Sequence, residues 1–319
     1  MMKTIIAIDG GGTKTNAVLV HNQTVVAYTK VEGTNLASID ASKIQAVLKK
    51  AMNDLETQAE EAYASVSAVF AGMSGGGRTT EQLRVKRSLQ PYVSDKATII
   101  VDSDVISALY SGTYGESGIV SIAGTGAVVY GLNDRNEQAR VGGWGYLFED
   151  AGSGFELGRQ ALLRSMQNED QNRTLSRLDQ AVLRHYNVKT MQALIPIIYE
   201  VDKERERIAS FSPVLSQLAN VGDFEATEII AHARTKQSDA IKHVRSQLFQ
   251  QDETCSIVLA GSVYQELHLW KPFFEEAIDH VKVIRPKYSP IAGAIVACDL
   301  ALNQMRTKEA YVKLFETLP

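Results

Sequence analysis

The chain has little cysteine, little net charge and no long hydrophobic run, and each shortage excludes a class of protein. Its only two cysteines, Cys255 and Cys298, stand in no paired motif and cannot build a disulfide scaffold, so we expect two buried side chains in a reducing cytosol. A net charge of −4 gives no reason to expect nucleic acid or an anionic membrane as a partner. No stretch approaches the ~20 apolar residues of a membrane-spanning helix, and the apolar segment 4–8 is too short for a signal peptide. These shortages predict a cytoplasmic globular protein.

The most informative feature that is present is a pair of glycine-threonine turns, each between two apolar segments typical of strands. Glycine lets the main chain approach a ligand closely and point successive N–H groups at phosphate oxygens. The first turn lacks the spacing of a Walker A loop, and Thr15 stands where a dinucleotide fingerprint has its third glycine. Taken alone, such a turn is equally well explained as a structural hairpin. The two turns read Asp9-Gly10-Gly11-Gly12-Thr13-Lys14-Thr15 and Gly124-Thr125-Gly126.

Strands and helices alternate along the chain, which predicts an α/β layer fold. The strand, glycine turn and strand that open the chain begin again at Gly118, so we expect two related halves. We place a first domain at residues 1–112 and a second at 113–319, the second carrying a helical insertion and a final helix able to pack back on the first domain. The periodicity predicts helices at 38–59, 80–89, 104–111 and 289–302, strands at 24–28, 65–73, 97–101 and 255–260, and a mainly helical segment at 155–250 with a break at 211–213.

Taken together, the motifs resemble those of the actin-like ATPase superfamily, in the branch that contains N-acetylglucosamine kinases and the BadF/BadG/BcrA/BcrD ATPase family. Residues 142–154 are the most specific match, since the kinases have a similar stretch, G-G-W-G-x-x-x-G-D-E-G-S. Further matches are Gly33-Thr34-Asn35, Ser74-Gly75-Gly76 and the segment 289–294. The resemblance runs over nearly the whole chain. It implies two ribonuclease H-like domains with a nucleotide and sugar cleft between them, and it implies ATP and Mg²⁺ as cofactors.

The resemblance also assigns site residues. Asp9 would organise the metal, and Lys14 would neutralise phosphate charge unless it is only a solvated turn residue. Trp144 would form a wall of the sugar pocket, or alternatively would anchor the core between glycine turns. The phosphate-binding and nucleotide-binding positions are Gly10, Gly11, Gly12, Thr13, Lys14, Thr15, Gly124, Thr125, Gly126, Gly261 and Ser262. The substrate-binding positions are Asn35, Ser74, Gly75, Gly143, Trp144 and Asp150.

A kinase acting on a hydroxyl needs a base, because the alcohol loses its proton as it attacks phosphorus. Asp102 and Asp104 both end the strand at 97–101. The spacing to Ser107 and on to Gly124 matches the kinase pattern best with Asp104 as the base, and a helix start there would help to keep its carboxylate ionised. An ordinary first-turn carboxylate is the alternative interpretation. Asp102 would assist metal-bound water or local structure.

The sequence departs from the kinase pattern at Glu149 and Ala151, where glycine and glutamate are usual. If that glutamate helps to select the sugar, the preference here is altered, and Glu156 is a candidate substitute. The charged run 202–207 is most simply a solvated helix face.

The leading hypothesis is an ATP-dependent kinase for a hydroxyl, expected to be the 6-hydroxyl, of an amino sugar, with N-acetylglucosamine as the first candidate. Glucosamine and N-acetylmuramate are alternatives. Two further classes are a partner-activating ATPase with a bridging iron-sulphur cluster and a non-catalytic sugar sensor. We expect a homodimer, with ATP and a small sugar as its other partners and neither nucleic acid nor membrane among them. The amphipathic tail around Tyr311 and Phe315 could pack on the N-terminal domain or on a second subunit.

Overall fold

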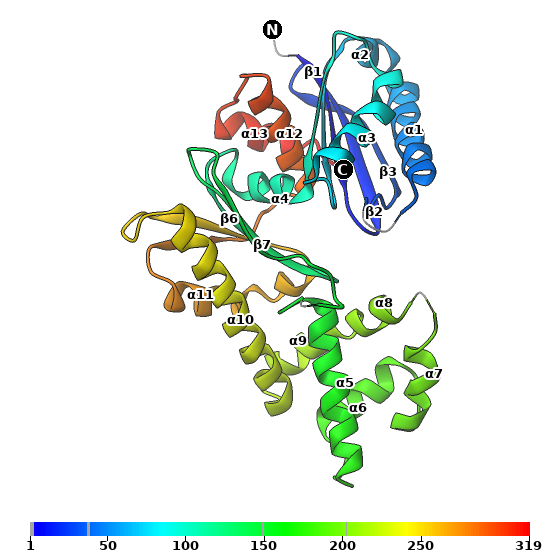
Figure 1. Ribbon diagram of the computed structural model, residues 1–319, viewed down its shortest axis with the longest axis vertical. Helices are drawn as coiled ribbons and strands as arrows, with labels where there is room; N and C mark the ends of the chain where they lie inside the picture. Colours follow the sequence, from blue (N-terminus) through cyan, green and yellow to red (C-terminus); the bar gives the residue numbers. More distant parts are fainter. Residues whose placement is uncertain (1–2, 37–38, 149, 202) are drawn as a thin grey trace. The chain divides into compact units, whose positions relative to one another are not determined.

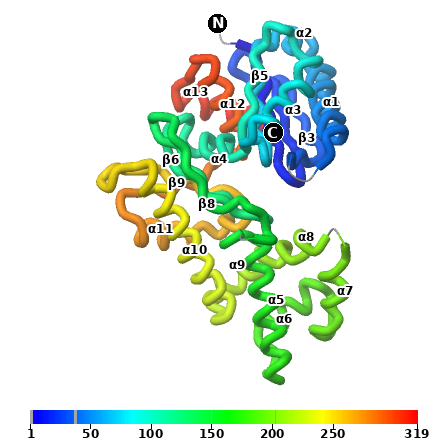
Figure 2. The backbone as a smooth tube through the Cα atoms, in the orientation of Figure 1, coloured from blue at the N-terminus to red at the C-terminus, as the bar shows by residue number. Residues whose placement is uncertain are grey.

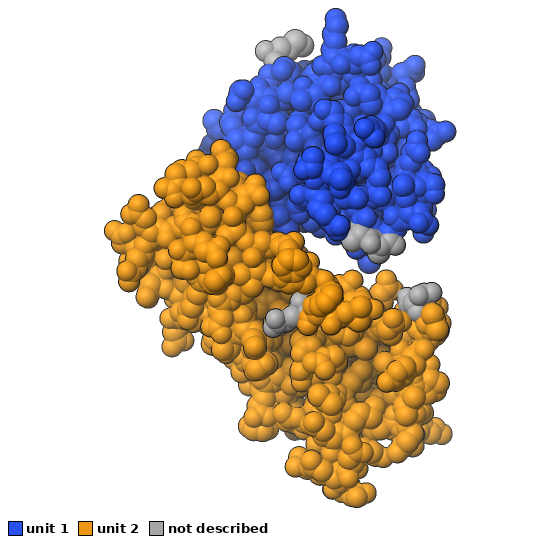
Figure 3. Space-filling view, in the orientation of Figure 1, with its two compact units in different colours: residues 1–116, 286–319 blue, residues 117–285 orange. Residues whose placement is uncertain are grey.

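The structure is a computed structural model, which describes residues 3–36, 39–148, 150–201 and 203–319. It divides into two compact units (Figure 3). Each unit has its own sheet and its own hydrophobic core. Unit 1 comprises residues 1–116 and 286–319, and unit 2 comprises residues 117–285. This division differs from the boundary expected after residue 112, because the chain returns from unit 2 to complete unit 1. None of the helices that the structure describes has the length and hydropathy needed to span a membrane.

Unit 1 is built on a five-stranded mixed sheet with the order β3-β2-β1-β4-β5. The first three strands form an antiparallel meander, whereas β1, β4 and β5 run parallel, so their carboxyl ends share one edge. The interior of β1 is buried throughout, which explains its continuous apolar segment. The strands are β1 Thr4–Gly10, β2 Lys14–His21, β3 Thr24–Glu32, β4 Val66–Met73 and β5 Thr98–Ser103.

Helices cover both faces of this sheet (Figure 1). On one face, α1 and α3 bury Leu48, Leu55 and Val85 against Ile6 and Ile8 of β1. On the other face, α12 packs on β1 and β4, and α4 packs beside it on β4. The helices are α1 Ala41–Gln58, α2 Glu60–Ala64, α3 Thr79–Leu89, α4 Asp104–Thr113, α12 Pro290–Ala301 and α13 Lys308–Phe315, with the 3-10 helix η1 at Gln90–Tyr92.

The C-terminal segment is an integral part of unit 1. The blue and red ends of the chain in Figure 2 both belong to this unit. The backbone N–H of Lys3 donates to Oε1 of Gln304 at 3.3 Å. Asp299 and Arg306, both buried, form an ion pair with Nε and Oδ2 2.6 Å apart. Because Tyr311 and Phe315 are also buried, the tail forms part of this core and does not offer an open amphipathic face.

Unit 2 repeats the same sheet plan. Its strand order is β10-β9-β6-β7-β8, with an antiparallel β6-β7-β8 meander and β9 and β10 parallel to β6. Position by position this matches β5-β4-β1-β2-β3 of unit 1, so the predicted duplication is confirmed. The strands are β6 Gly118–Ala123, β7 Ala127–Leu132, β8 Gln138–Gly142, β9 Cys255–Ala260 and β10 Val281–Ile284.

The segment predicted to be mainly helical is so in the structure. A new helix begins at Ser212, as the predicted break requires, and Asp223 caps the next one by accepting from the N–H of Ala226 at 3.0 Å. The helices are α5 Gly154–Asp170, α6 Arg177–His185, α7 Ile195–Ile198, α8 Glu204–Ala209, α9 Ser212–Asn220, α10 Phe224–Leu248 and α11 Lys271–Ala277, with η2 Met191–Leu194, η3 Ser262–Gln265 and η4 Leu267–Leu269.

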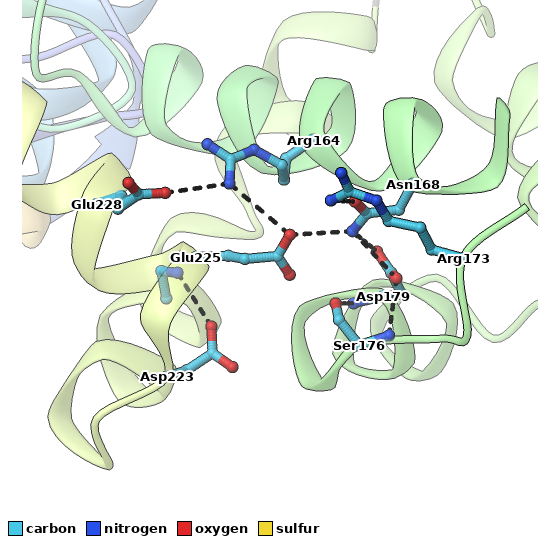
Figure 4. Close-up of polar contacts among 9 residues, drawn as sticks. Arg164, Asn168, Arg173, Ser176, Asp179, Asp223, Glu225 and Glu228 are labelled. Carbon is cyan, nitrogen blue, oxygen red and sulfur yellow. Dashed lines mark hydrogen bonds and ion pairs between the residues drawn. The ribbon is translucent and has the colours of Figure 1, made fainter. Parts of the chain in front are cut away.

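A buried polar network joins three of these helices (Figure 4). The side-chain amide of Asn168 on α5 donates to Oδ1 of Asp179 on α6 at 3.2 Å and to Oε1 of Glu225 on α10 at 3.0 Å. Asp179 also accepts from the backbone N–H of Ser176 at 2.8 Å, which completes a capping box. The network therefore holds α5, which begins at Gly154, against α6 and α10.

Gly293 sets the distance between α12 and α4. A Cβ at this position would lie 1.8 Å from the carbonyl oxygen of Ser107 and 2.5 Å from the backbone nitrogen of Ser111. Only glycine therefore permits this approach of two helix backbones.

We predict that Gly293→Ala destabilises unit 1 by about 3 kcal/mol or more, because the new methyl group meets backbone that cannot move aside. In calorimetry the unit 1 transition should fall by roughly 6–12 °C. Gly77→Ala is the matched control, because a Cβ there meets nothing within 4 Å. Equal melting temperatures for the two variants would contradict the close approach.

Candidate functional site

Three carboxylates gather at the carboxyl end of the unit 1 sheet. In the strand register Asp9 of β1 lies beside Gly72 of β4, and Gly72 lies beside Asp102 of β5. Asp104 follows two residues later as the first residue of α4. The predicted position of Asp104 at a helix start is therefore confirmed, while its role as a base stays a prediction.

The carboxyl group of Asp9 is in an unfavourable environment for a charge. Its pKa is raised from 3.8 to about 7, first because of burial and second because of the nearby charge of Asp104. A hydrogen bond from the Asn16 side chain and the charge of the exposed Lys14 oppose this rise without cancelling it. Tyr28 donates its hydroxyl to Oδ1 of Asn16 at 3.0 Å, which leaves the amide nitrogen of Asn16 for Asp9.

Asp104 has its own set of hydrogen-bond donors. Burial raises its pKa, while hydroxyl groups of Ser103 and Ser74 and backbone N–H groups at the start of α4 partly stabilise the charged form. The Ser103 hydroxyl lies 3.3 Å from Oδ1 of Asp104. Burial also raises the pKa of Asp102, which accepts from the N–H of Ser103 at 2.7 Å. Ser74, predicted as a substrate contact, is thus placed at the candidate base.

The first glycine turn is braced by the loop after β3. The N–H of Thr34 donates to the carbonyl oxygen of Gly11 at 2.9 Å, and the hydroxyls of Thr15 and Thr34 are 2.8 Å apart. A Cβ on Gly33 would lie 2.2 Å from the carbonyl oxygen of Gly12, so at this point the backbones of the two loops are in direct contact. Gly12, Thr13 and Lys14 are exposed at the tip, where a ligand could reach them.

The loop after β4 completes this group. The N–H of Ser74 donates to the carbonyl oxygen of Gly10 at 2.7 Å, and the carbonyl oxygen of Ser74 accepts from the N–H of Leu36 at 3.0 Å. Gly75 has a φ of +79°, a conformation that favours glycine. The structure therefore brings together the predicted residues of unit 1, including Asn35, which precedes Leu36.

The second glycine turn lies at the start of α5. The N–H of Gly154 donates to the carbonyl oxygen of Gly124 at 2.7 Å, and the N–H of Gly124 donates to the carbonyl oxygen of Gly126 at 2.9 Å. Gly261, with a φ of +101°, lies so close that a Cβ there would be 2.2 Å from the carbonyl oxygen of Ala123. The predicted second phosphate turn and the predicted adenosine loop are therefore neighbours within unit 2.

Asp150 lies against the second turn and is paired with Arg205. A Cβ on Gly126 would be 3.1 Å from Oδ2 of Asp150 and 2.7 Å from Nη2 of Arg205. The two charged groups are 3.5 Å apart. Burial raises the pKa of Asp150, and the charge of Arg205 opposes that rise. The interpretation of 202–207 as a solvated helix face is thus wrong for Arg205, whose guanidinium lies over the ring of Tyr146 at 5.1 Å.

Trp144 does not anchor the core. The residue is 67% exposed, and the guanidinium of Arg140 lies 4.5 Å from the centre of its ring. Its exposed ring could therefore contact a ligand at the surface. The backbone N–H of the preceding residue, Gly143, donates to the carbonyl oxygen of Ala127 at 3.0 Å. Glu149 lies outside the described residues. Glu156 is bonded to Arg159 and Gln160 on its own helix.

A small polar pocket adjoins the Gly261 loop. Ser262 lines it together with Ser212 and Gln217 of α9 and with Glu266. The guanidinium of Arg285 donates to the carbonyl oxygen of Gly261 at 2.9 Å, which holds the loop from the side of β10. Serine hydroxyls, an amide and a carboxylate are groups that could bind a nucleoside.

The described part of the chain contains no group of three or more histidine, cysteine, aspartate or glutamate residues arranged to hold a metal. Mg²⁺ needs fewer, because it is commonly bound through one or two carboxylates together with substrate phosphates and water. Asp9 and Asp104 fit that requirement, because they are neighbouring carboxylates at one sheet edge and a bound cation would offset the unfavourable effect of the Asp104 charge on Asp9.

Comparison with known proteins gives the family. The model of the BadF/BadG/BcrA/BcrD ATPase family matches residues 6–301. The chain belongs to this family. A curated relative, the N-acetylmuramic acid/N-acetylglucosamine kinase of Clostridium acetobutylicum, is 27% identical over 92% of this chain and 98% of its own length. The N-acetyl-D-glucosamine kinase of Dictyostelium discoideum is 28% identical over 94% of this chain and 98% of its own.

A solved structure has the same fold. It is that of a Chromobacterium violaceum protein named as a candidate N-acetylglucosamine kinase, and it matches with a TM-score of 0.73 at 24% identity, covering 92% of this chain and 98% of that one. The predicted α/β fold of two related domains is therefore confirmed, and the structure adds that each domain is built on a five-stranded mixed sheet with helices.

We predict that Asp9 makes unit 1 less stable as the pH rises. Since its pKa is raised to about 7, the native state binds more protons than the unfolded state between about pH 4 and 7, and the free energy of unfolding falls as the pH rises through that window. The full effect is on the order of 4 kcal/mol. The melting temperature of wild type should fall between pH 5 and 8, and Asp9→Asn should show a clearly smaller fall.

Asp95→Asn, which removes an exposed carboxylate from the same unit, controls for the change in net charge. If the melting temperatures of wild type and Asp9→Asn fell by the same amount between pH 5 and 8, the charged form of Asp9 would not be destabilised in the folded protein.

Proposed function

We propose that this protein is an ATP-dependent kinase that phosphorylates a hydroxyl group, expected to be the 6-hydroxyl, of an amino sugar, with N-acetylglucosamine as the first candidate. The observation that carries the proposal is the environment of Asp104. This carboxylate lies at a helix start beside the first glycine turn, has a raised pKa and receives hydrogen bonds from Ser74 and Ser103. The relatives, which are kinases for these sugars by name, support the same substrate class.

In the proposed reaction the acceptor oxygen forms a bond to the γ-phosphorus of ATP while the bond from that phosphorus to the β,γ-bridging oxygen breaks. The bridging oxygen leaves with the electron pair as part of ADP. The proton of the acceptor hydroxyl passes to a carboxylate oxygen of Asp104. A raised pKa favours this step, because a more basic carboxylate accepts a proton more readily once it is ionised.

Mg²⁺ supplies charge neutralisation and orientation of the phosphates when it is bound. We assign Asp9 as its protein contact, because this carboxylate is buried beside Asp104 and lacks a full counter-charge. The N–H groups of the turns at Gly10–Thr15 and Gly124–Gly126 would then hold phosphate oxygens, and Gly261 and Ser262 would bind the nucleoside.

Asn35, Ser74, Gly75, Gly143, Trp144 and Asp150 are the proposed sugar contacts. An exposed Trp144 supports a stacking role against a sugar ring, and the buried Asp150 can accept hydrogen bonds from hydroxyls. Glucosamine and N-acetylmuramate remain the alternative acceptors, because Ala151 replaces the glutamate expected beside Asp150.

The other function classes have less support. An iron-sulphur ATPase that shares its cluster between subunits needs accessible thiols, whereas Cys255 and Cys298 are both buried and burial raises the pKa of each thiol. A sensor that only binds sugar needs no base, so it does not account for Asp104 beside the proposed phosphate turn. A cytoplasmic location and a homodimer stay proposals; light scattering on the purified protein tests the second.

The Asp104→Asn variant tests the proposal. Because asparagine cannot accept the hydroxyl proton, kcat should fall by roughly 10²–10⁴-fold, while calorimetry should still detect binding of N-acetylglucosamine. Asp95→Asn is the matched control on the surface of the same unit. Wild-type protein is assayed for ADP release and phosphosugar formation with N-acetylglucosamine, glucosamine, N-acetylmuramate and glucose. Failure with every sugar would overturn the substrate class, and an active Asp104→Asn would overturn the role of Asp104.

A further inference from the structure

Two glycines of α5, one turn apart, let the chain segment that ends α8 and begins α9 approach closely. A Cβ on Gly158 would lie 1.9 Å from the carbonyl oxygen of Ile208, and a Cβ on Gly154 would lie 2.9 Å from the hydroxyl of Ser212. At Gly158 no side chain of α5 therefore separates it from the backbone of α8, and at Gly154 the facing group is the small hydroxyl of Ser212. Because α5 begins at the second glycine turn, this packing brings Arg205 of α8 to that turn.

The guanidinium of Arg205 is fixed in place but has more donors than partners. A guanidinium carries five N–H donors. Its Nη2 atom reaches Oδ2 of Asp150 at 3.5 Å, the limit of a hydrogen bond, and its buried Nε atom has no partner. The ring of Tyr146, 5.1 Å away, supports one face of the group without using its N–H donors. Such an under-satisfied cation is suited to an anionic ligand.

The position of this cation indicates which anion it binds. Nη2 lies 2.7 Å from the point that a Cβ on Gly126 would occupy, closer than it lies to Asp150. Arg205 thus stands beside the second phosphate turn on one side and a proposed sugar-binding carboxylate on the other. The phosphate of ATP nearest to the acceptor sugar is the γ-phosphate.

We propose that Arg205 binds the γ-phosphoryl group of ATP during its transfer, an inference that rests on the proposed kinase function. The guanidinium stays protonated throughout, so it exchanges no proton with the substrates. It would stabilise the negative charge on the oxygens of the phosphoryl group as the bond to ADP breaks and the bond to the acceptor forms. Without nucleotide, its contact with Asp150 holds it at the turn.

A different anion could in principle reach the same group, namely a carboxylate carried by the acceptor, as in N-acetylmuramate. The short approach to Gly126 favours phosphate, since that glycine belongs to the proposed phosphate turn. If Arg205 binds the phosphate, its loss affects the reaction with a neutral acceptor; if it binds an acceptor carboxylate, its loss does not. The experiment below separates these two alternatives.

The experiment uses Arg205→Gln and Arg205→Lys, with Arg207→Gln as the matched control. Arg207 lies on the same helix but donates to the carbonyl oxygen of Ile197 and pairs with Glu200, away from the glycine turn. Calorimetry measures the affinity for ADP and for a non-hydrolysable ATP analogue, and steady-state kinetics measures kcat and KM with N-acetylglucosamine and with N-acetylmuramate.

We expect Arg205→Gln to weaken binding of the ATP analogue by about 10–100-fold, the loss of a charge-assisted hydrogen bond, with ADP affinity changed less than about threefold. For each sugar that the wild-type protein phosphorylates, kcat of Arg205→Gln should be lower than that of wild type by at least about 10²-fold. Arg205→Lys should recover part of both losses because it keeps the charge. Arg207→Gln should behave as wild type.

Equal losses for ADP and the ATP analogue, a loss confined to the carboxylate-bearing acceptor, or no loss at all would each overturn the proposal. A melting curve for Arg205→Gln detects misfolding. If that variant is misfolded, the conservative Arg205→Lys is tested instead, by comparing its affinity for ADP with its affinity for the ATP analogue. The nucleotide measurements need no sugar. They therefore test Arg205 even if wild type phosphorylates none of the sugars. That result would overturn the proposed function but not the proposed role of Arg205.

Discussion

The candidate site depends on the burial of two carboxylates, Asp9 and Asp104, at the carboxyl end of the unit 1 sheet, and the charge of Asp104 adds to the effect of burial on Asp9. Parallel strands that end at a common edge bring them together, and burial denies them the water that would otherwise stabilise both charges. Such a location would suit the cation and the acceptor proton of the proposed reaction. The same burial is expected to lower stability at neutral pH.

Most of the unit 1 site could be predicted because its determinants are local in the sequence. The first turn, Asp104 and the Ser74 loop each follow an apolar strand directly, and hydrophobic periodicity locates such strands well. The loop contacts could not be predicted, because they depend on which strands are neighbours. Gly33 against Gly12 is an example, since the two residues are brought together only by the pairing of β2 with β3.

The errors have equally physical causes. Short edge strands such as β8 and β10 were not predicted, because four or five residues with polar positions show no usable period. Arg205 was missed because neighbouring charges of both signs are typical of a solvated helix. Its position beside Asp150 follows from the close packing of α8 on Gly158 of another helix, which the charged segment itself cannot reveal. Trp144 was left undecided, because a tryptophan between glycines fits a core and a surface equally well.

Unit 2 is a single continuous segment, whereas unit 1 needs both α4 and α12, which are separated by all of unit 2. During synthesis from the N-terminus, unit 2 is therefore complete in sequence before the partner helix of α4 has been made. The apolar faces of β1 and β4 that α12 covers stay uncovered for about 170 residues of translation, a delay on the order of ten seconds or more. The half that holds the candidate base is consequently the half most exposed to misassembly on the ribosome.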